Sequence, residues 1–153
     1  EPGKGTNFYV YLPQCQEQIS GVVVQETEIP GGRERILFVD DEPAIARSGR
    51  KMLSKLGYEV TALTDSTEAL NAFKETPDAF DLLLTDMTMP NMTGTSLAVE
   101  ILKIRPDLPV ILCTGYAELV TPEEVKRLGV RQFVLKPLSM REVGIIVRRV
   151  LDE

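Results

Sequence analysis

The chain has 153 residues, a formal net charge of −6 and 43% hydrophobic residues, which suits one soluble domain with a tail. The acidic balance argues against a nucleic-acid binder, and the chain has neither a polybasic patch for an anionic membrane nor an apolar run long enough to span one. Because it contains no histidine, imidazole catalysis and histidine–zinc sites are excluded. Cys15 and Cys113 match no metal or redox spacing and fit a reducing, cytoplasmic setting.

The first 33 residues differ in pattern from the rest of the chain. Residues 7–12 favour a strand, which Pro13 would end. A polar stretch follows, and then a stretch that is rich in Glu, Pro and Gly. We interpret residues 14–33 as a linker.

From Arg35 onward, short apolar runs alternate with amphipathic segments. Residues 58–62 alternate in polarity, which is typical of a strand at the edge of a sheet. The other four runs are continuously apolar, as in strands that are buried on both faces. They are residues 36–39, 82–84, 110–113 and 133–135.

The amphipathic segments have helix signals at their ends. Pro43 suits the first turn of the first helix, which would end near Gly57, and Asp65 or Ser66 can cap the second. The later signals are Pro106 after the third helix, a capping box from Thr121 to Glu124 and Gly129 for the fourth, and a second box of Ser139 with Glu142 for the fifth. Five strands alternating with five helices predict an α/β fold whose parallel sheet has helices on both faces.

Polar side chains follow the predicted strands at their carboxyl ends, where such folds bind ligands. Asp40 and Asp41 follow the first strand, and Asp86 closes the third. Three carboxylates in such close proximity would repel one another unless a cation joined them. A set of ligands made only of oxygen atoms suits Mg²⁺. Thr114 and Lys136 follow the fourth and fifth strands and could bind phosphoryl oxygens. These groups suffice for phosphoryl transfer to a carboxylate, with a donor from elsewhere because the chain lacks histidine.

Residues 34–153 resemble the receiver domain of response regulators. The signatures that carry the resemblance are Asp40-Asp41, Asp86 with Met89-Pro90 and Gly94, Thr114-Gly115 and Lys136-Pro137, in the family's order and spacing. The resemblance implies a doubly wound, flavodoxin-like sheet of five parallel strands in the order 2-1-3-4-5. It also implies a role in two-component phosphorelay signalling.

The resemblance assigns roles to single residues. Asp86 would accept the phosphoryl group from a phosphohistidine, with Thr114 and Lys136 assisting. Asp41, Asp86 and the backbone carbonyl of Thr88 would bind Mg²⁺, and Asp40 would act on the metal through water. The phosphohistidine would belong to a histidine kinase, in cis or in trans, and the group could pass on to a histidine phosphotransfer protein.

The same resemblance implies a conformational switch. Thr114 would be drawn toward the phosphoryl group, and Phe133 would turn inward into the space that Thr114 leaves. Gly115 would keep the acceptor accessible. Thr88 and Tyr116 would flank the path of a hydrolytic water and tune the lifetime of the acyl phosphate.

Residues 1–13 resemble the last glycine box and final strand of a histidine-kinase ATP-binding domain, through Gly3-Lys4-Gly5-Thr6 and the strand after it. Thirteen residues cannot form that domain. We therefore expect the C-terminal receiver of a hybrid sensor histidine kinase, itself a phosphoacceptor, whose transferase activity would belong to the parent. The fragment would be cytoplasmic and make no membrane contact, although the parent could be anchored in a membrane. Because the chain ends directly after its last helix, we expect its output to act through a partner or the parent kinase.

Other interpretations stay open at this point. The chain could be a stand-alone response regulator or a phosphate sink. A haloacid-dehalogenase-type phosphatase is a further alternative, although it would need an Asp-x-Asp pair and a cap domain, for which there is no room. Asp40 and Asp41 could also simply cap a helix. A degenerate receiver is disfavoured because every signature group is present.

Overall fold

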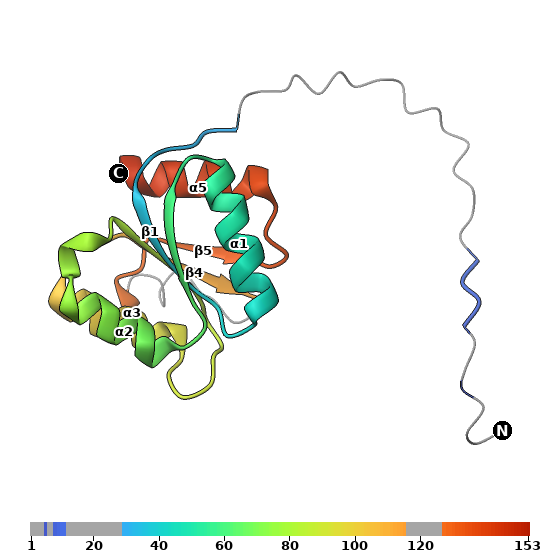
Figure 1. The fold of residues 1–153 in the computed structure, drawn as a ribbon, viewed down its shortest axis with the longest axis horizontal. Helices are drawn as coiled ribbons and strands as arrows, with labels where there is room; N and C mark the ends of the chain where they lie inside the picture. Colours follow the sequence, from blue (N-terminus) through green and yellow to red (C-terminus); the bar gives the residue numbers. More distant parts are fainter. Residues whose placement is uncertain (1–4, 6–7, 12–28, 116–126) are drawn as a thin grey trace.

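The computed structural model describes Gly5 and residues 8–11, 29–115 and 127–153. Its strands are β1 (Arg35–Val39), β2 (Glu59–Leu63), β3 (Leu82–Asp86), β4 (Val110–Thr114) and β5 (Gln132–Leu135). Its helices are α1 (Pro43–Lys55), α2 (Ser66–Glu75), α3 (Gly94–Ile104) and α5 (Met140–Asp152), with a 3-10 turn, η1, at Pro77–Ala79 (Figure 1). The capping box predicted at residues 121–124 lies outside the described residues.

The five strands form one parallel sheet in the order β2-β1-β3-β4-β5. This confirms the predicted fold class and strand order, with β2 at an edge. The chain leaves β1 toward β2 on one side and returns to β3 on the other side, so the strand order reverses between β1 and β3. Ligands of doubly wound sheets bind beyond the carboxyl ends of the strands at such a reversal.

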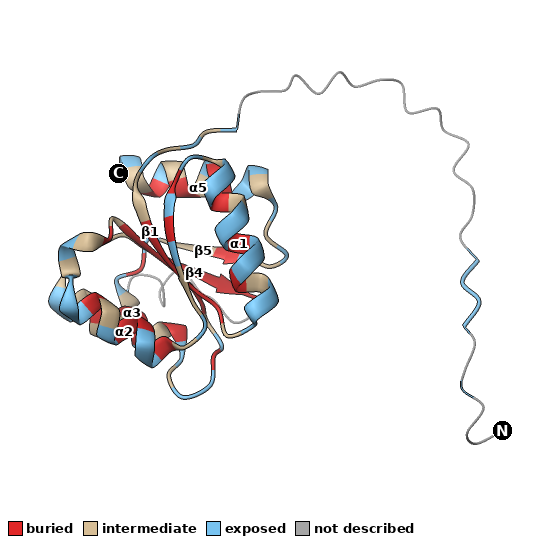
Figure 2. Ribbon diagram, in the orientation of Figure 1, coloured by how far each residue is buried: buried red, intermediate tan, exposed pale blue. Residues whose placement is uncertain are grey.

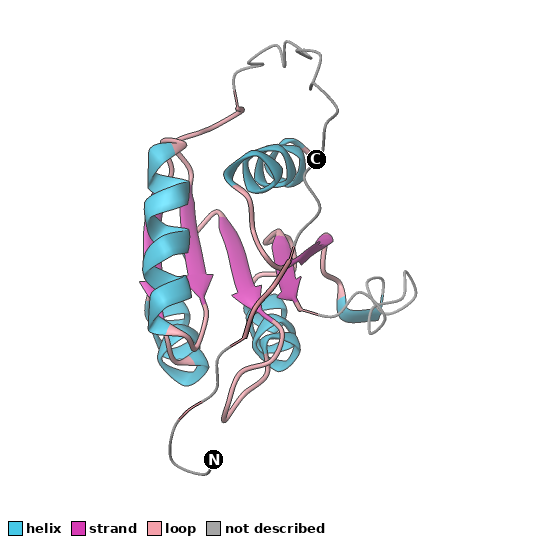
Figure 3. Cartoon of the chain, turned by 90° about the vertical axis from the view of Figure 1, so that its right-hand side faces the viewer, coloured by secondary structure: helices cyan, strands magenta, loops and turns pink. Residues whose placement is uncertain are grey.

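Helices cover both faces of the sheet: in Figure 1, α1 and α5 lie on one side of the strands and α2 and α3 on the other, and Figure 3 shows the strands side by side. Successive side chains of a strand point to opposite faces. Ile36 and Phe38 therefore pack in the cluster that α1 and α5 cover, and Leu37 and Val39 pack in the cluster that α2 and α3 cover. All four are fully buried, and in Figure 2 the buried residues concentrate on the strands and on the inner sides of the helices. The continuous apolar pattern of β1 thus reflects burial from both sides.

The helix ends follow the predicted signals. Pro43 occupies the first turn of α1, and Gly57 has a positive φ of 96° just after the helix. Asp65 caps α2, because its Oδ1 accepts hydrogen bonds from the amides of Thr67 and Glu68 at 2.8 and 2.9 Å. Ser66, the alternative cap, is buried in the first turn instead.

At the amino terminus, the structure describes only part of the predicted pieces. The side chains of Phe8, Tyr9, Val10 and Tyr11 are exposed. Residues 29–33, the end of the predicted linker, lie against the folded domain. The domain boundaries themselves stay predictions. Within the described ranges, no helix combines the length and apolar character needed to cross a membrane.

Candidate functional site

Four predicted site residues meet at the carboxyl edge of the sheet. Asp40 follows β1 directly, and Asp86 and Thr114 end β3 and β4. These three side chains are buried although they are polar. Lys136 follows β5, and its amide continues the sheet by donating to the carbonyl of Thr114 at 2.8 Å. The parallel registers bring residues from four distant parts of the chain to one edge.

The ammonium of Lys136 bridges the two buried carboxylates. Its Nζ atom lies 2.7 Å from Oδ2 of Asp40 and 2.7 Å from Oδ1 of Asp86. An unpaired buried charge is costly, and charge-assisted hydrogen bonds offset that cost. Lys136 is therefore the cation that lets two carboxylates lie close together at this edge.

The second oxygen of each carboxylate is bonded to the backbone two residues further on. Oδ1 of Asp40 accepts from the amide of Glu42 at 3.1 Å, and Oδ2 of Asp86 accepts from the amide of Thr88 at 2.9 Å. Each carboxylate thus accepts a hydrogen bond from the backbone of the turn that follows it, which is a common local interaction of Asp. The N-cap of α1 is Glu42, so Asp40 holds the amide of the residue before the helix and is not itself the capping residue.

The electrostatic setting keeps Lys136 charged. Burial alone would lower the pKa of its ammonium, but the hydrogen bonds to Asp40 and Asp86 outweigh burial, so the pKa is raised above the ordinary lysine value. One ammonium against these two carboxylates and the neighbouring Asp41 leaves an excess of negative charge. A further cation would be attracted to this edge.

The donor set fits Mg²⁺ in kind, because Asp40, Asp41 and Asp86 offer only oxygen ligands, which hard cations prefer. Asp41 is half-buried on the same loop as Asp40. Among the described residues, however, no three acidic or sulfur-bearing side chains gather closely enough to form a metal centre by themselves. The ammonium of Lys136 takes the position between Asp40 and Asp86 instead. The metal ligands, with the Thr88 carbonyl, therefore stay a prediction.

The loop after Asp86 packs tightly against the backbone of that residue. The amide of Gly94 donates to the carbonyl of Met87 at 3.0 Å. A Cβ atom at position 94 would lie 1.9 Å from the backbone oxygen of Asp86, so only glycine fits there. Met89 is buried in the core cluster and Met92 packs at its margin, which matches the gap-filling role of methionine.

The predicted switch residues share one face of the sheet. Phe133 pairs in register with Leu112, and Thr114 pairs with Leu135. Phe133 is half-buried against the cluster under α2 and α3, whereas Thr114 is buried. The arrangement puts both residues on the same side, as the switch would require. Tyr116, the other predicted tuning residue, lies outside the described residues.

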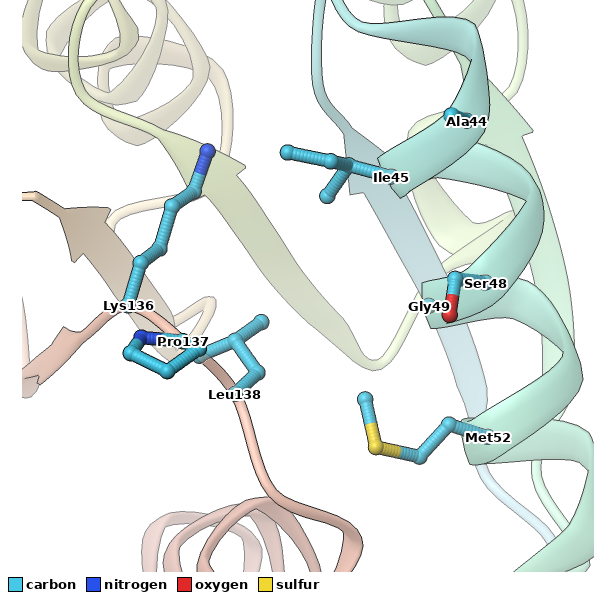
Figure 4. Close-up of a pocket in the computed structure, with 8 residues that line it drawn as sticks. All are labelled: Ala44, Ile45, Ser48, Gly49, Met52, Lys136, Pro137 and Leu138. Carbon is cyan, nitrogen blue, oxygen red and sulfur yellow. The ribbon is translucent and has the colours of Figure 1, made fainter. Parts of the chain in front are cut away.

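Beside Lys136 lies a cavity of about 480 Å³ that sequence reasoning missed. Figure 4 shows Lys136, Pro137 and Leu138 on one side and the first turns of α1 on the other. Ile45 and Met52 touch the core only partly and also line this cavity. The apolar stripe of α1 is the only sequence signal for this cavity. A helix face that is wholly packed in the core would show the same stripe.

Comparisons with known proteins agree with this geometry. The model of the response regulator receiver domain matches residues 36–148. Sensor kinase CckA of Brucella abortus (strain 2308) is 30% identical over 162 aligned positions, which cover 100% of this chain and 17% of that protein. Two-component response regulator ARR11 of Arabidopsis thaliana is 37% identical over 117 positions, covering 76% of this chain and 22% of that protein.

Among solved structures, the receiver domain of sensor histidine kinase PA1611 from Pseudomonas aeruginosa PAO1 is 27% identical with a TM-score of 0.70. The match covers 80% of this chain and 100% of that one, and that structure has a magnesium ion coordinated in the active-site cleft. The chain spans about a fifth of the length of CckA and of ARR11.

Proposed function

The chain belongs to the family of response regulator receiver domains of two-component signalling, and we propose that it accepts a phosphoryl group from a phosphohistidine onto Asp86, with Mg²⁺. One observation carries the proposal. Asp86 is a buried carboxylate whose Oδ1 lies 2.7 Å from the ammonium of Lys136 and whose Oδ2 is held by the Thr88 amide. The family match gives no support to the phosphatase alternative.

In the proposed step, a carboxylate oxygen of Asp86 forms a bond to phosphorus while the bond from phosphorus to the histidine nitrogen breaks. The imidazole of the donor keeps the electron pair of that bond. Lys136 already donates to Oδ1 and can turn the same hydrogen bond toward a phosphoryl oxygen attached there. Thr114, buried at the end of the next strand, offers a hydroxyl to another phosphoryl oxygen.

Mg²⁺ would be held by Asp40, Asp41, Asp86 and the Thr88 carbonyl, and when bound it would neutralise charge on carboxylate and phosphoryl oxygens. The excess of negative charge at this edge supports that assignment. The magnesium in the PA1611 receiver is the corresponding observation in a similar protein.

Thr114 and Phe133 are proposed as the switch pair that responds to the phosphoryl group. Their shared face of the sheet supports this role. Thr88 and Tyr116 are proposed to tune the lifetime of the acyl phosphate. The amide of Thr88 donates a hydrogen bond to the carboxylate of Asp86, which supports the proposed role of Thr88.

We propose that the parent is a hybrid sensor histidine kinase, with this domain in the cytoplasm. The similarity to CckA includes the residues before the receiver domain, because it covers 100% of this chain. The resemblance of residues 1–13 to the end of a kinase ATP-binding domain points the same way. A stand-alone regulator is the other candidate, and similarity to ARR11 over the receiver part alone is compatible with it. The coding sequence upstream of residue 1 distinguishes the two.

The partner that carries the phosphohistidine is proposed to contact the cavity between α1 and Lys136. This cavity is lined by apolar parts of Ile45, Met52 and Leu138 and opens beside the ammonium that bonds to Asp86. A partner seated there would have its reactive side chain next to the acceptor. A histidine phosphotransfer protein could use the same surface to take the group on.

The test is phosphorylation by acetyl phosphate, followed by intact mass measurement. The protein is incubated with and without Mg²⁺, beside Asp86→Asn and the control Asp107→Asn, which changes an exposed aspartate far from the site. The expected result is a gain of one phosphoryl group in the wild type and in the control, only with Mg²⁺. Labelling of Asp86→Asn to the wild-type level would refute the assignment of the acceptor.

A further inference from the structure

The six residues before β1 are packed on the domain instead of trailing from it. We call residues 29–34 the strap. The amide of Gly32 donates to the carbonyl of Leu56, at the end of α1, at 3.0 Å. Oε1 of Glu34 lies 2.8 Å from Nη1 of Arg148 in α5. The strap is therefore bonded to two helices that are far from it in sequence.

Glycines make this close packing possible on both sides of the contact. A Cβ atom on Gly31 would lie 2.0 Å from the carbonyl oxygen of Leu56. A Cβ atom on Gly144, within α5, would lie 2.6 Å from Cγ2 of Ile29 and 2.9 Å from the carbonyl oxygen of Pro30. Glycine is one of the weakest helix formers, so a glycine inside α5 calls for a packing reason. The strap provides that reason.

An ion-pair network closes the strap from the outside. The guanidinium of Arg148 bonds to Glu34 and also to Asp152, one turn further along α5. The ring of Tyr58 is buried, and its Cε1 atom would lie 2.6 Å from a Cβ atom at position 32. The strap is thus held both by close packing against Tyr58 and Gly144 and by the ion pair of Glu34 with Arg148, which we call the clamp.

The strap lies at the end of the sheet opposite to the acceptor. It leads directly into Arg35, the first residue of β1, while Asp40 and Asp86 follow or close strands at the other end. The α1 and α5 helices run back from the acceptor edge, so Leu56 and Arg148 lie toward the strap. In Figure 1 the chain enters β1 beside the carboxyl-terminal part of α5.

We propose that the strap is a docking segment that holds the entering chain on the surface formed by α1 and α5. The preceding chain therefore leaves the domain at the amino ends of the strands, opposite to Asp86. The tether to any upstream domain then ends at Ile29 and not at Arg35. If the phosphohistidine donor belongs to the same chain, the tether must lead around the domain to reach Asp86. This consequence rests on the proposed function. Releasing the strap would lengthen that tether by six residues, roughly 20 Å of extended chain.

Hydrogen–deuterium exchange on this protein tests the proposal, because one substitution should speed exchange in the strap without speeding it in α5. Gly144→Ala improves the intrinsic helix propensity of α5, yet its methyl group collides with the strap. We expect amide exchange at Gly31–Glu34 to become several-fold faster, while exchange within α5 is unchanged or slower. Ile145→Ala, on the exposed side of the same helix, is the matched control and should leave the strap as it is.

A second pair of variants tests the clamp. Glu34→Gln removes the carboxylate that holds Arg148 to the strap, whereas Asp152→Asn removes only the other partner of the same guanidinium. Faster strap exchange in Glu34→Gln and not in Asp152→Asn supports the proposal. Fast, unprotected exchange at Gly32 in the wild type, or unchanged strap exchange in both Gly144→Ala and Glu34→Gln, overturns it.

Uptake of a phosphoryl group from acetyl phosphate is measured on the same variants. Because the strap is remote from Asp86, uptake should be equal in the wild type and in Gly144→Ala. A failure of the wild type to be phosphorylated would count against the proposed function, whereas the exchange data decide on the strap. The two proposals therefore fail separately.

Discussion

Nζ of Lys136 lies 2.7 Å from Oδ1 of Asp86, and this contact links the residue after β5 to the last residue of β3. The same ammonium reaches Asp40, so a single lysine compensates two buried carboxylates. The proposed acceptor thus lies against a cation that comes from a distant part of the chain. Four testable predictions follow from this site and from the fold around it.

Replacing Lys136 by Met should lower the free energy of unfolding by about 1–3 kcal/mol, because two buried carboxylates then face each other without a cation. The loss is smaller than for a fully buried pair because part of the Lys136 side chain is exposed. Urea denaturation measures it. Added Mg²⁺ should recover part of the loss, since it would replace the missing positive charge.

Lys103→Met is the control for that experiment. Lys103 pairs with Glu100 on the surface of α3, and exposed pairs of this kind contribute about 0–1 kcal/mol. Equal stability of Lys136→Met and the wild type would show that the carboxylates do not depend on the lysine.

Gly94→Ala should destabilise the fold by about 1–3 kcal/mol and reduce phosphoryl uptake, because its Cβ would press against the backbone oxygen of Asp86. Gly115→Ala is a matched glycine substitution next to the site. Nothing lies within 4 Å of a Cβ at position 115, so its stability should equal that of the wild type. Thermal unfolding of the two variants checks both statements, and an unchanged midpoint for Gly94→Ala would contradict the first.

The thiol of Cys113 should be unreactive in the folded protein. Burial raises its pKa to about 12, and the thiolate is the reactive form. In a Cys15→Ser background Cys113 is the only thiol. Ellman's reagent at pH 8 should label it only after guanidinium is added, and rapid labelling without denaturant would show that β4 opens to solvent.

The ion pair of Arg35 with Asp81 should make stability depend on pH in the acid range. Hydrogen bonds from the Arg35 guanidinium hold the pKa of Asp81 below its ordinary value, against the opposite effect of burial. A carboxyl whose pKa is lowered by folding stabilises the native state above its unfolded pKa, about 3.9, and loses that contribution as the pH falls through the folded value.

Asp81→Asn should therefore be less stable than the wild type at pH 7, by less than about 1 kcal/mol because the pair is partly exposed. The difference should shrink as the pH falls below about 4. Denaturation at pH 7 and pH 3 compares the two proteins. A difference that grows toward low pH would contradict the assignment.

Much of the fold could be predicted from local patterns. The runs at 36–39, 82–84 and 110–113 are apolar at every position because each strand is covered on both faces, and a helix of that length would show a polar side. Proline at position 43 and the cap at Asp65 act over a few residues, so they are legible without tertiary structure. The site was predictable for a similar reason, since polar residues that directly follow buried strands must meet at one edge of a parallel sheet.

The sequence by itself determined which residues reach that edge, but only the tertiary structure decided how they pair there and how the strap is held. A pattern of Pro and two Gly before β1 has the composition of a linker, and nothing local distinguishes it from one. Its partners, Leu56, Gly144 and Arg148, are distant in the chain and come within reach only when α1 and α5 pack on the same face of the sheet. Contacts of this kind depend on distances between elements, and periodicity carries no information about those distances.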